Sequence, residues 1–208
     1  LISDSLPKVP VIGVFGTCMN AGKTTVCASI LSFLTERGLC VHAGKVAGVA
    51  CRQDLDKMRR HGAQKVLSFH DLGLPSTAGI ATLRPVARTI IHYLAEGSPD
   101  AIVLEMGDGI LGGYQVASLF EDVELMDLQA CSVLCANDLL GVWGGLQWIR
   151  QSASNASFLS YLISGPVTDS AEGVRYIEEE FRVTAANAFD SPGKIHKFLM
   201  QSLMPWFA

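Results

Sequence analysis

A glycine-bracketed loop near the start of the chain carries the residues whose chemistry is easiest to interpret. Gly16 opens the loop and Gly22-Lys23-Thr24 closes it, so five residues lie between the two glycines, where four are usual. Glycines let backbone N–H groups turn inward around phosphate oxygens, a lysine here reaches the β- and γ-phosphates, and a threonine hydroxyl binds Mg²⁺. The pattern predicts a phosphate-binding loop, and the expected nucleotide contacts are Gly16, Thr17, Asn20, Ala21, Gly22, Lys23, Thr24 and Thr25.

Two elements must hold this loop in place. Residues 11–15 are a continuous apolar run that predicts a buried strand, and residues 26–34 repeat apolar side chains at helical spacing. Strand, glycine loop and helix in this order are the context in which such a loop binds phosphate, because the helix N-terminus adds a partial positive charge. The alternative is a glycine turn that precedes a helix by chance.

The width of the loop is its most specific feature. Gly-Thr-x-x-x-x-Gly-Lys-Thr, here residues 16–24, follows an apolar strand and resembles dethiobiotin synthetase, an ATP-dependent ring-forming carboxylase-ligase. The loop is also similar in length to that of P-loop amino-acid N-acetyltransferases of the D-glutamate type. Both families belong to a wider group that includes the MinD-like ATPases. Cys18 stands where the synthetase signature has Asp, so the chain departs from the family inside the loop.

Apolar strand candidates alternate with helix candidates along the whole chain, which is typical of βαβ units in a parallel sheet. The expected strands are residues 11–15, 40–46, 65–69, 101–104, 130–136, 158–163 and 182–186. The expected helices are residues 26–34, 52–60, 85–95, 114–120, 139–151, 170–181 and a last one from 192. We therefore expect residues 1–208 to form a single P-loop nucleotide-binding domain, a three-layer α/β fold. It should have about seven mostly parallel strands and helices on both faces.

Ligands bind beyond the carboxyl ends of the strands in such sheets, so charged residues at those ends are site candidates. Lys45 lies at the end of the second expected strand, and the resemblance implies that it faces substrate and phosphate and acts with Lys23; a surface lysine is the alternative. Glu105 follows the fourth strand, and the resemblance implies that it holds Mg²⁺ or its water together with Thr24. Asp108 is a second carboxylate that fits a metal ligand, a base or a turn residue.

Further candidates lie in the loops. The resemblance implies an aspartate soon after the second strand that helps to hold Mg²⁺, and Asp54 fits this role better than Asp56. Ser76 and Thr77 belong to a polar loop suited to substrate contacts, although a Ser/Thr turn explains them equally well. Arg84 offers the planar fork that suits a substrate carboxylate.

One expected contact is with the nucleotide base. The synthetase has an adenine-contacting Asn at the end of its sixth strand, where this chain has Ser164-Gly165-Pro166. Asn187, after the last expected strand, is the substitute candidate.

Composition narrows the class of protein. Hydrophobic residues make up 49% of the 208 residues and charged ones 17%, as expected of a parallel sheet covered on both faces. A net charge of −4 indicates no nucleic-acid partner, and no apolar run approaches the roughly 18 residues of a membrane helix. The first residues lack the features of a signal peptide, and the six cysteines show no metal-ligand spacing. We expect buried, reduced thiols and a cytoplasmic location.

The leading functional expectation is a Mg²⁺- and ATP-dependent enzyme that transfers the γ-phosphoryl group to a small carboxylate or carbamate. One alternative is the P-loop domain of an amino-acid N-acyltransferase. The other is a MinD-like ATPase switch, which usually carries an additional lysine early in the loop; residues 17–21 contain none.

Two expectations concern partners. The apolar segment 139–149, with Trp143 and Trp148, predicts a homodimer whose small-molecule site lies near the subunit interface, as in the synthetase. Two core tryptophans are the alternative. The chain starts without Met, which also fits a segment of a longer protein with an additional N-terminal domain.

Overall fold

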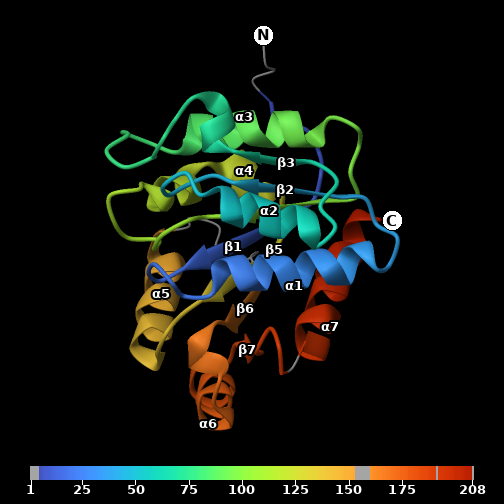
Figure 1. The fold of residues 1–208 in the computed structure, drawn as a ribbon. Helices are drawn as coiled ribbons and strands as arrows, with labels where there is room; N and C mark the ends of the chain where they lie inside the picture. Colours follow the sequence, from blue (N-terminus) through green and yellow to red (C-terminus); the bar gives the residue numbers. More distant parts are fainter. Residues whose placement is uncertain (1–4, 153–159, 191, 208) are drawn as a thin grey trace.

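The computed structural model describes residues 5–152, 160–190 and 192–207. Its centre is a seven-stranded sheet, parallel throughout, in the order β3-β2-β4-β1-β5-β6-β7 (Figure 1). The strands are β1 (Val11–Gly16), β2 (Val41–Lys45), β3 (Val66–Ser68), β4 (Ala101–Glu105), β5 (Gln129–Cys135), β6 (Tyr161–Ser164) and β7 (Thr184–Ala185). The expected α/β fold with about seven mostly parallel strands is confirmed.

Helices cover both faces of the sheet. One face is covered by α1 (Lys23–Thr35), α2 (Arg52–Arg60) and α7 (Pro192–Leu203). The other face is covered by α3 (Arg84–Ala95), α4 (Val123–Asp127), α5 (Leu139–Ser152) and α6 (Ala171–Tyr176). In Figure 1, α1 and α2 lie in front of the strands. The predicted three layers are therefore present.

The strands are apolar throughout because both of their faces are buried. In β1, Ile12 and Val14 point into the core beneath α1, while Val11 and Phe15 point into the core beneath α3. Successive side chains of a strand alternate between the two cores, so neither position can be polar. This arrangement explains why the sequence shows a continuous apolar run here and not an alternating one.

Several predicted boundaries needed correction. α1 begins at Lys23, three residues before its predicted start, directly after Gly22 in the left-handed region at φ 90°. α4 was not predicted, because a five-residue helix is too short to show helical periodicity. The helix expected at 114–120 is a 3₁₀ turn, Val116–Glu121, and a π turn extends α6. Residues 158 and 159 of the expected sixth strand lie outside the described residues, as does residue 191, which precedes α7.

The cysteines differ in burial. All six are free; Cys27, Cys131 and Cys135 are buried as expected, and Cys40 is half-buried. Burial raises the pKa of both Cys131 and Cys135 to about 12, so these thiols remain protonated. Cys18 and Cys51 are exposed, so the expectation of buried thiols is wrong for both.

The two tryptophans of α5 differ in their surroundings. Trp148 is partly buried and packs edge-on against Phe120, with the ring centroids 5.1 Å apart. Trp143 is 51% exposed, so it is not the core residue that the alternative interpretation made it. Within the described ranges, no helix is long and apolar enough to cross a membrane.

Candidate functional site

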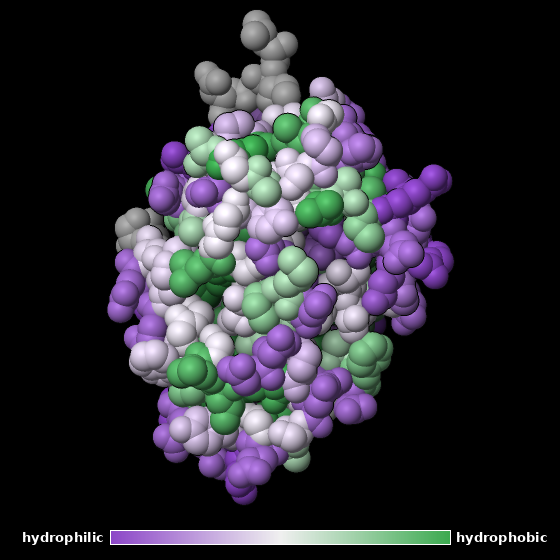
Figure 2. All heavy atoms as spheres, turned by 60° about the vertical axis from the view of Figure 1, so that its left-hand side comes forward, coloured by the Kyte–Doolittle hydropathy of each residue, from purple (hydrophilic) through white to green (hydrophobic). Residues whose placement is uncertain are grey.

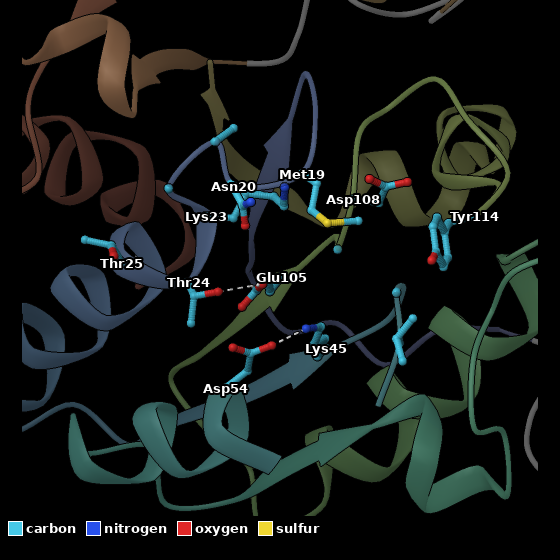
Figure 3. A pocket seen from close by; sticks show the side chains of 15 residues that line it. Met19, Asn20, Lys23, Thr24, Thr25, Lys45, Asp54, Glu105, Asp108 and Tyr114 are labelled. Atoms are coloured by element: carbon cyan, nitrogen blue, oxygen red, sulfur yellow. Dashed lines mark hydrogen bonds and ion pairs between the residues drawn. The ribbon is translucent and has the colours of Figure 1, made fainter. Parts of the chain in front are cut away.

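A cavity of about 440 Å³ opens at the carboxyl ends of β1, β2 and β4 (Figure 3). Its walls come from the loop after β1, the first turn of α1 and the loops after β2 and β4. The lining residues are Met19, Asn20, Ala21, Gly22, Lys23, Thr24, Thr25, Lys45, Gly48, Val49, Asp54, Glu105, Gly107, Asp108 and Tyr114. This phosphate-loop cavity brings together most of the predicted loop contacts and all of the predicted metal and catalytic residues.

Lys23 lies inside the curve of the loop. Its side chain is buried, and its Nζ donates a hydrogen bond to the carbonyl oxygen of Cys18 at 2.8 Å. A Cβ atom at Gly16 would lie 2.6 Å from Nζ and 2.9 Å from Cδ of Lys23, so a side chain there would displace the lysine. Gly16 therefore positions the ammonium group without lining the cavity. Thr17 faces α5, where its hydroxyl would lie 3.2 Å from a Cβ at Gly141.

The first turn of α1 forms the floor of the cavity. Gly22 precedes the helix with φ 90° and has no side chain to cap its first N–H groups, and the first residues of α1 line the cavity. Those groups and the helix dipole provide partial positive charge, which attracts an anion. Asn20 also adopts a left-handed conformation, φ 59°, at the tip of the loop.

Glu105 faces Thr24 across the cavity. β4 pairs with β1 in a register that places Glu105 beside Val14, so the carboxylate stands next to the phosphate loop. Thr24 Oγ1 donates a hydrogen bond to Glu105 Oε1 at 3.0 Å. Glu105 Oε2 is buried and, in the described structure, has no hydrogen-bond partner. Burial raises the pKa of Glu105 above its ordinary 4.5, and the charge of Lys45 offsets this only in part.

Lys45 and Asp54 form an ion pair on the other side of Glu105. β2 pairs with β4 so that Lys45 and Glu105 are direct neighbours, and Lys45 Nζ contacts Asp54 Oδ2 at the start of α2. Burial alone would lower the pKa of Lys45, but Glu105 and Asp54 outweigh it and raise that pKa. Lys45 is thus a charged, buried lysine within the cavity wall, and the surface-lysine alternative does not apply.

The glycine-rich loop after β4 closes the remaining side. A Cβ atom at Gly107 would lie 1.9 Å from the carbonyl oxygen of Ala47, so this loop approaches the one after β2 as closely as glycine allows. Asp108 has φ 63° and lines the cavity with Tyr114. Figure 3 shows both side chains across the cavity from Thr24. Tyr114 was missed in the sequence because it stands nine residues after the strand and belongs to no motif.

Ser76 and Thr77 do not line this cavity. Thr77 is fully buried, and its hydroxyl accepts a hydrogen bond from the Gly48 N–H at 3.0 Å. The Ser76 hydroxyl accepts one from the Ala78 N–H, as in a Ser/Thr turn, and lies near the Gly48 carbonyl. Both residues therefore support the Gly48 segment of the cavity wall from behind.

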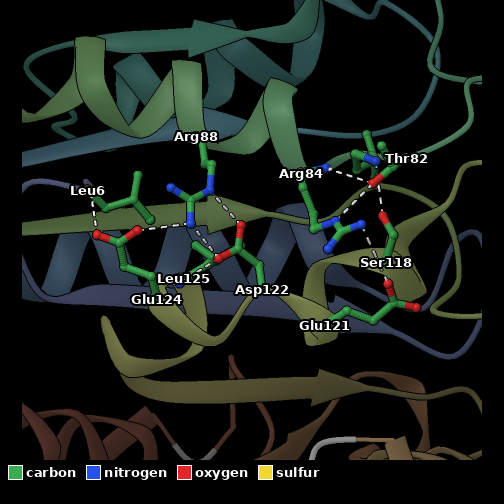
Figure 4. Close-up of polar contacts among 10 residues, drawn as sticks. Leu6, Thr82, Arg84, Arg88, Ser118, Glu121, Asp122, Glu124 and Leu125 are labelled. Atoms are coloured by element: carbon green, nitrogen blue, oxygen red, sulfur yellow. Dashed lines mark hydrogen bonds and ion pairs between the residues drawn. The ribbon is translucent and has the colours of Figure 1, made fainter. Parts of the chain in front are cut away.

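Arg84 and Asn187 also lie away from the phosphate loop. Arg84 begins α3, where it contacts Thr82 and lies 3.8 Å from Glu121 (Figure 4). Asn187 lines a separate cavity of about 470 Å³, and its Nδ2 donates to Asp169 at 2.7 Å. Its Oδ1 accepts from two backbone N–H groups, so the amide is already held in place.

The residues present suit a hard cation such as Mg²⁺. Glu105 Oε2 is a buried carboxylate oxygen that lacks a partner among the described residues, and the hydroxyl of Thr24 donates to the other oxygen of the same carboxylate. Asp54 borders the same cavity, but it is ion-paired with Lys45. Among the described residues, no group of three or more His, Cys, Asp or Glu side chains forms a metal-binding cluster. A magnesium ion here would therefore need phosphate oxygens and water to complete its shell.

Comparisons with known proteins support the fold. No family model matches the chain, and no curated protein matches it in sequence. Cobyrinic acid a,c-diamide synthase from Mycobacterium smegmatis, solved with an ATP analogue and magnesium, matches with a TM-score of 0.62 at 16% identity over 96% of each chain. Hydrogenase maturation factor HypB from Archaeoglobus fulgidus matches with a TM-score of 0.57 at 15% identity, over 94% of this chain and 91% of that one.

A third structure extends the pattern. Cell division protein FtsY from Thermotoga maritima matches with a TM-score of 0.56 at 17% identity, over 96% of this chain and 71% of that one. Together these structures show that the chain has the α/β fold of the P-loop NTPases. At such low identity the likeness concerns the fold, and it does not single out the dethiobiotin synthetase or MinD-like families.

Proposed function

We propose that this chain is a Mg²⁺- and ATP-dependent enzyme that transfers the γ-phosphoryl group to a small carboxylate or carbamate. The observation that carries the proposal is the unpartnered, buried Oε2 of Glu105 beside the Thr24 hydroxyl in a phosphate-loop cavity. A buried carboxylate oxygen without a partner costs free energy, so its place beside the phosphate loop favours a bound cation.

The phosphate chain would bind in the loop. Lys23 exchanges its hydrogen bond to the Cys18 carbonyl for one to a phosphate oxygen, and the first N–H groups of α1 bind the oxygens from below. Thr24 and Glu105 would hold Mg²⁺, and Asp54 is a predicted further ligand that would first have to release Lys45. When bound, the ion offsets negative charge on the β- and γ-phosphates.

Lys45 is placed to assist the transfer step. An acceptor carboxylate oxygen attacks the γ-phosphorus, the bond to the oxygen that bridges the β-phosphate breaks, and ADP leaves. Lys45, which lies beside Glu105 in the register of β2 and β4, offsets charge on the transferred group. In a ligase-like reaction an amine then attacks the acyl phosphate and releases inorganic phosphate and a proton.

The base of the nucleotide has a separate place to bind. Gly165 and Pro166 pack against Gly22, since a Cβ there would lie 3.4 Å from Gly165 Cα. Three residues beyond Pro166, Asp169 lines the cavity that also contains Asn187. A nucleotide held by the phosphate loop would extend across Gly165 towards Asn187. Adenine is our proposal from the sequence, and the neighbour FtsY from Elizabethkingia anophelis, solved with GDP, makes GTP the competitor to test.

Titration calorimetry tests nucleotide binding directly. ATP and GTP, each with Mg²⁺, are titrated into the chain, and acetyl-coenzyme A provides the ligand that the acyltransferase alternative requires. We expect Lys23→Ala to weaken ATP binding by at least about a hundredfold. The variant lacks the buried ammonium group and therefore the charge-assisted hydrogen bonds that this group would donate to the phosphates. Lys65→Ala, which removes a lysine that pairs with Glu96, is the matched control. Unchanged ATP affinity in a folded Lys23→Ala variant would refute the phosphate-loop assignment.

We also propose a homodimer, formed over the edge of the molecule at which the carboxyl ends of the strands lie. Exposed apolar side chains occur on three segments at the carboxyl ends of the strands: Met19 at 58%, Leu111 at 63%, and Leu140 and Trp143 on α5 at 74% and 51%. Figure 2 shows the side of the molecule that lies to the left in Figure 1. On this surface, hydrophobic residues lie among hydrophilic ones. Light scattering at micromolar concentrations should give the mass of a dimer, and Leu140→Ser should shift it towards a monomer. A monomeric mass for the unaltered chain would rule the dimer out.

A further inference from the structure

A hydrogen bond joins α2 to the first turn of α1 at the edge of the phosphate-loop cavity. Lys57 Nζ, on α2, donates to Thr25 Oγ1 at 3.2 Å, and Thr25 lines the cavity. Lys57 is half-buried and is not itself part of the cavity lining. Its contact with the cavity wall is therefore made through the Thr25 hydroxyl.

This hydrogen bond determines where the Thr25 hydroxyl hydrogen can point. An ammonium group only donates, so Thr25 Oγ1 is the acceptor and its own hydrogen is directed away from Lys57. Thr35 on the same helix shows the usual fate of such a hydrogen, because its hydroxyl donates back to the Leu31 carbonyl oxygen at 2.8 Å. Among the described residues, Thr25 Oγ1 donates to no acceptor. The hydroxyl, next to Thr24 in Figure 3, therefore has a hydrogen to offer to a ligand.

The charge of Lys57 is not offset by an ion pair. Within the described ranges, no carboxylate lies within 4.0 Å of its Nζ, and both aspartates of α2 have other partners. Asp54 pairs with Lys45, and Asp56 contacts two arginines of the same helix. A donor that keeps its full charge polarises the hydroxyl that accepts from it. That hydroxyl then becomes a stronger donor to the next acceptor.

An anionic oxygen in the cavity is the acceptor that fits this hydroxyl. Thr25 belongs to the first turn of α1, where the helix dipole also favours an anion. We propose that Lys57 is a positioning residue of the nucleotide site, which holds and polarises the Thr25 hydroxyl so that it donates to a phosphate oxygen. This inference rests on the proposed function, since it adds a residue to the same nucleotide site. Lys57 stands 32 residues after Thr25, so no motif in the sequence contains both.

A double-mutant cycle tests whether Lys57 acts through Thr25. Titration calorimetry with Mg²⁺-ATP compares the unaltered chain with Lys57→Gln, with Thr25→Val and with the variant that carries both substitutions. Lys57→Gln should weaken ATP binding about tenfold, the scale of one charge-assisted hydrogen bond. In a chain that already carries Thr25→Val, the same substitution should weaken binding less than about twofold, because the hydroxyl on which Lys57 acts is gone. Lys57→Arg keeps a charged donor and should retain most of the affinity.

Arg60 provides the matched control for charge. It lies on α2 three residues after Lys57, is exposed, and in the described part of the chain also forms no ion pair; its Nε donates to the Asp56 carbonyl oxygen. Arg60→Gln removes the same charge from the same helix, and it should change ATP affinity less than about twofold because solvent and salt screen an exposed charge. Equal effects of Lys57→Gln and Arg60→Gln would mean that the net charge of α2, and not the Thr25 hydroxyl, attracts the nucleotide.

Two further results would overturn the role of Lys57 while the proposed function stands. One is that Mg²⁺-ATP binds the unaltered chain, but Lys57→Gln weakens binding equally with and without Thr25→Val, so that the two residues act independently. The other is that Lys57→Gln lowers the free energy of unfolding in urea and leaves ATP affinity unchanged, so that the bond only joins α1 to α2. If neither ATP nor GTP binds the unaltered chain, the proposed function fails, and the inference fails with it.

Discussion

Two groups of charged side chains in this molecule contain the same ingredients, a cation and two carboxylates. Arg88, Asp122 and Glu124 form what we call the α3–α4 network, on the sheet face covered by those helices (Figure 4). Its carboxylate oxygens are all occupied. Arg88 Nε and Nη2 contact the two oxygens of Asp122 at 2.7 and 2.8 Å, and Glu124 accepts from Arg88 Nη2 at 2.9 Å and from the Leu6 N–H at 2.6 Å.

The second group, Lys45, Asp54 and Glu105, forms the strand-end network at the carboxyl ends of β2 and β4 (Figure 3). Lys45 pairs with Asp54, and Thr24 donates to one oxygen of Glu105. The other oxygen of Glu105 is buried and has no partner in the described structure. The strand-end network is therefore one interaction short of complete.

This difference separates a structural role from a binding role. A buried carboxylate with every oxygen paired stabilises the native state relative to variants that lack one partner. A buried carboxylate with an open oxygen lowers stability, and a fold retains such a group where a ligand completes it. The pKa values agree in direction. Burial alone would raise the pKa of Asp122, but Arg88 and the Leu125 N–H lower it below 3.8, whereas the pKa of Glu105 is raised.

Removal of Asp122 should have the largest effect on stability. Asp122→Ala leaves Arg88 and the start of α4 without their acceptor, since Asp122 also caps that helix through the Leu125 N–H. We expect a loss of about 3 kcal/mol in the free energy of unfolding, at the low end for buried pairs because the Arg88 side chain is 30% exposed. Urea unfolding followed by tryptophan fluorescence measures it. Asp127→Ala, on the exposed end of α4, should change stability by less than about 0.5 kcal/mol. A loss below about 1 kcal/mol for Asp122→Ala would remove the contrast between the networks.

A pair of isosteric variants compares the networks directly. Glu105→Gln removes the charge of the incomplete network, and Glu124→Gln removes the same charge from the complete one. In the absence of ligand, we expect Glu105→Gln to leave stability unchanged or raise it, and Glu124→Gln to lower it by about 1 kcal/mol, since its bond to Arg88 is partly exposed. With nucleotide present, Glu105→Gln should weaken the Mg²⁺ dependence of binding at least about tenfold, because a hard cation prefers an anionic oxygen. An unaltered Mg²⁺ titration would make Glu105 structural and Asp108 the next candidate.

The parts of the site that the sequence predicted depend on local order along the chain. The phosphate loop follows from a strand, a glycine loop and a helix in succession, so Gly22, Lys23 and Thr24 could be assigned before the fold was known. Lys45 and Glu105 could be assigned because all carboxyl ends of a parallel sheet lie at one edge. These predictions needed only the direction of the strands.

The parts that could not be predicted depend on contacts between distant segments. Whether Thr77 faces a ligand or supports Gly48 is decided by how the loop after β3 folds back on the loop after β2. Arg84 looked like a carboxylate-binding residue, but it lies beside Glu121 on a different loop. The open oxygen of Glu105 is likewise a property of packing that no spacing in the sequence reveals.

The smallest predicted effect is on the pH dependence of stability. Stability should change with pH in opposite directions for the two networks. The pKa of Glu105 is raised in the native state above its ordinary 4.5, so directly above that pH the native state binds more protons than the unfolded chain, and stability falls as pH rises from 4.5 towards the raised pKa. Asp122 behaves in the reverse way, because its native pKa lies below 3.8 and stability falls as pH falls through that lower window. Each pKa unit of difference corresponds to about 1.4 kcal/mol.

Urea unfolding from pH 3 to pH 8 measures both slopes. Glu105→Gln should abolish the loss of stability above pH 4.5 and leave the acid limb intact, while Asp122→Ala should flatten the acid limb alone. Mg²⁺ with nucleotide should remove the Glu105 slope from the unaltered chain, since a bound cation stabilises the ionised carboxylate and lowers its pKa. If the slope above pH 4.5 persists in Glu105→Gln, another group causes it and Glu105 Oε2 is not the open position that the comparison requires.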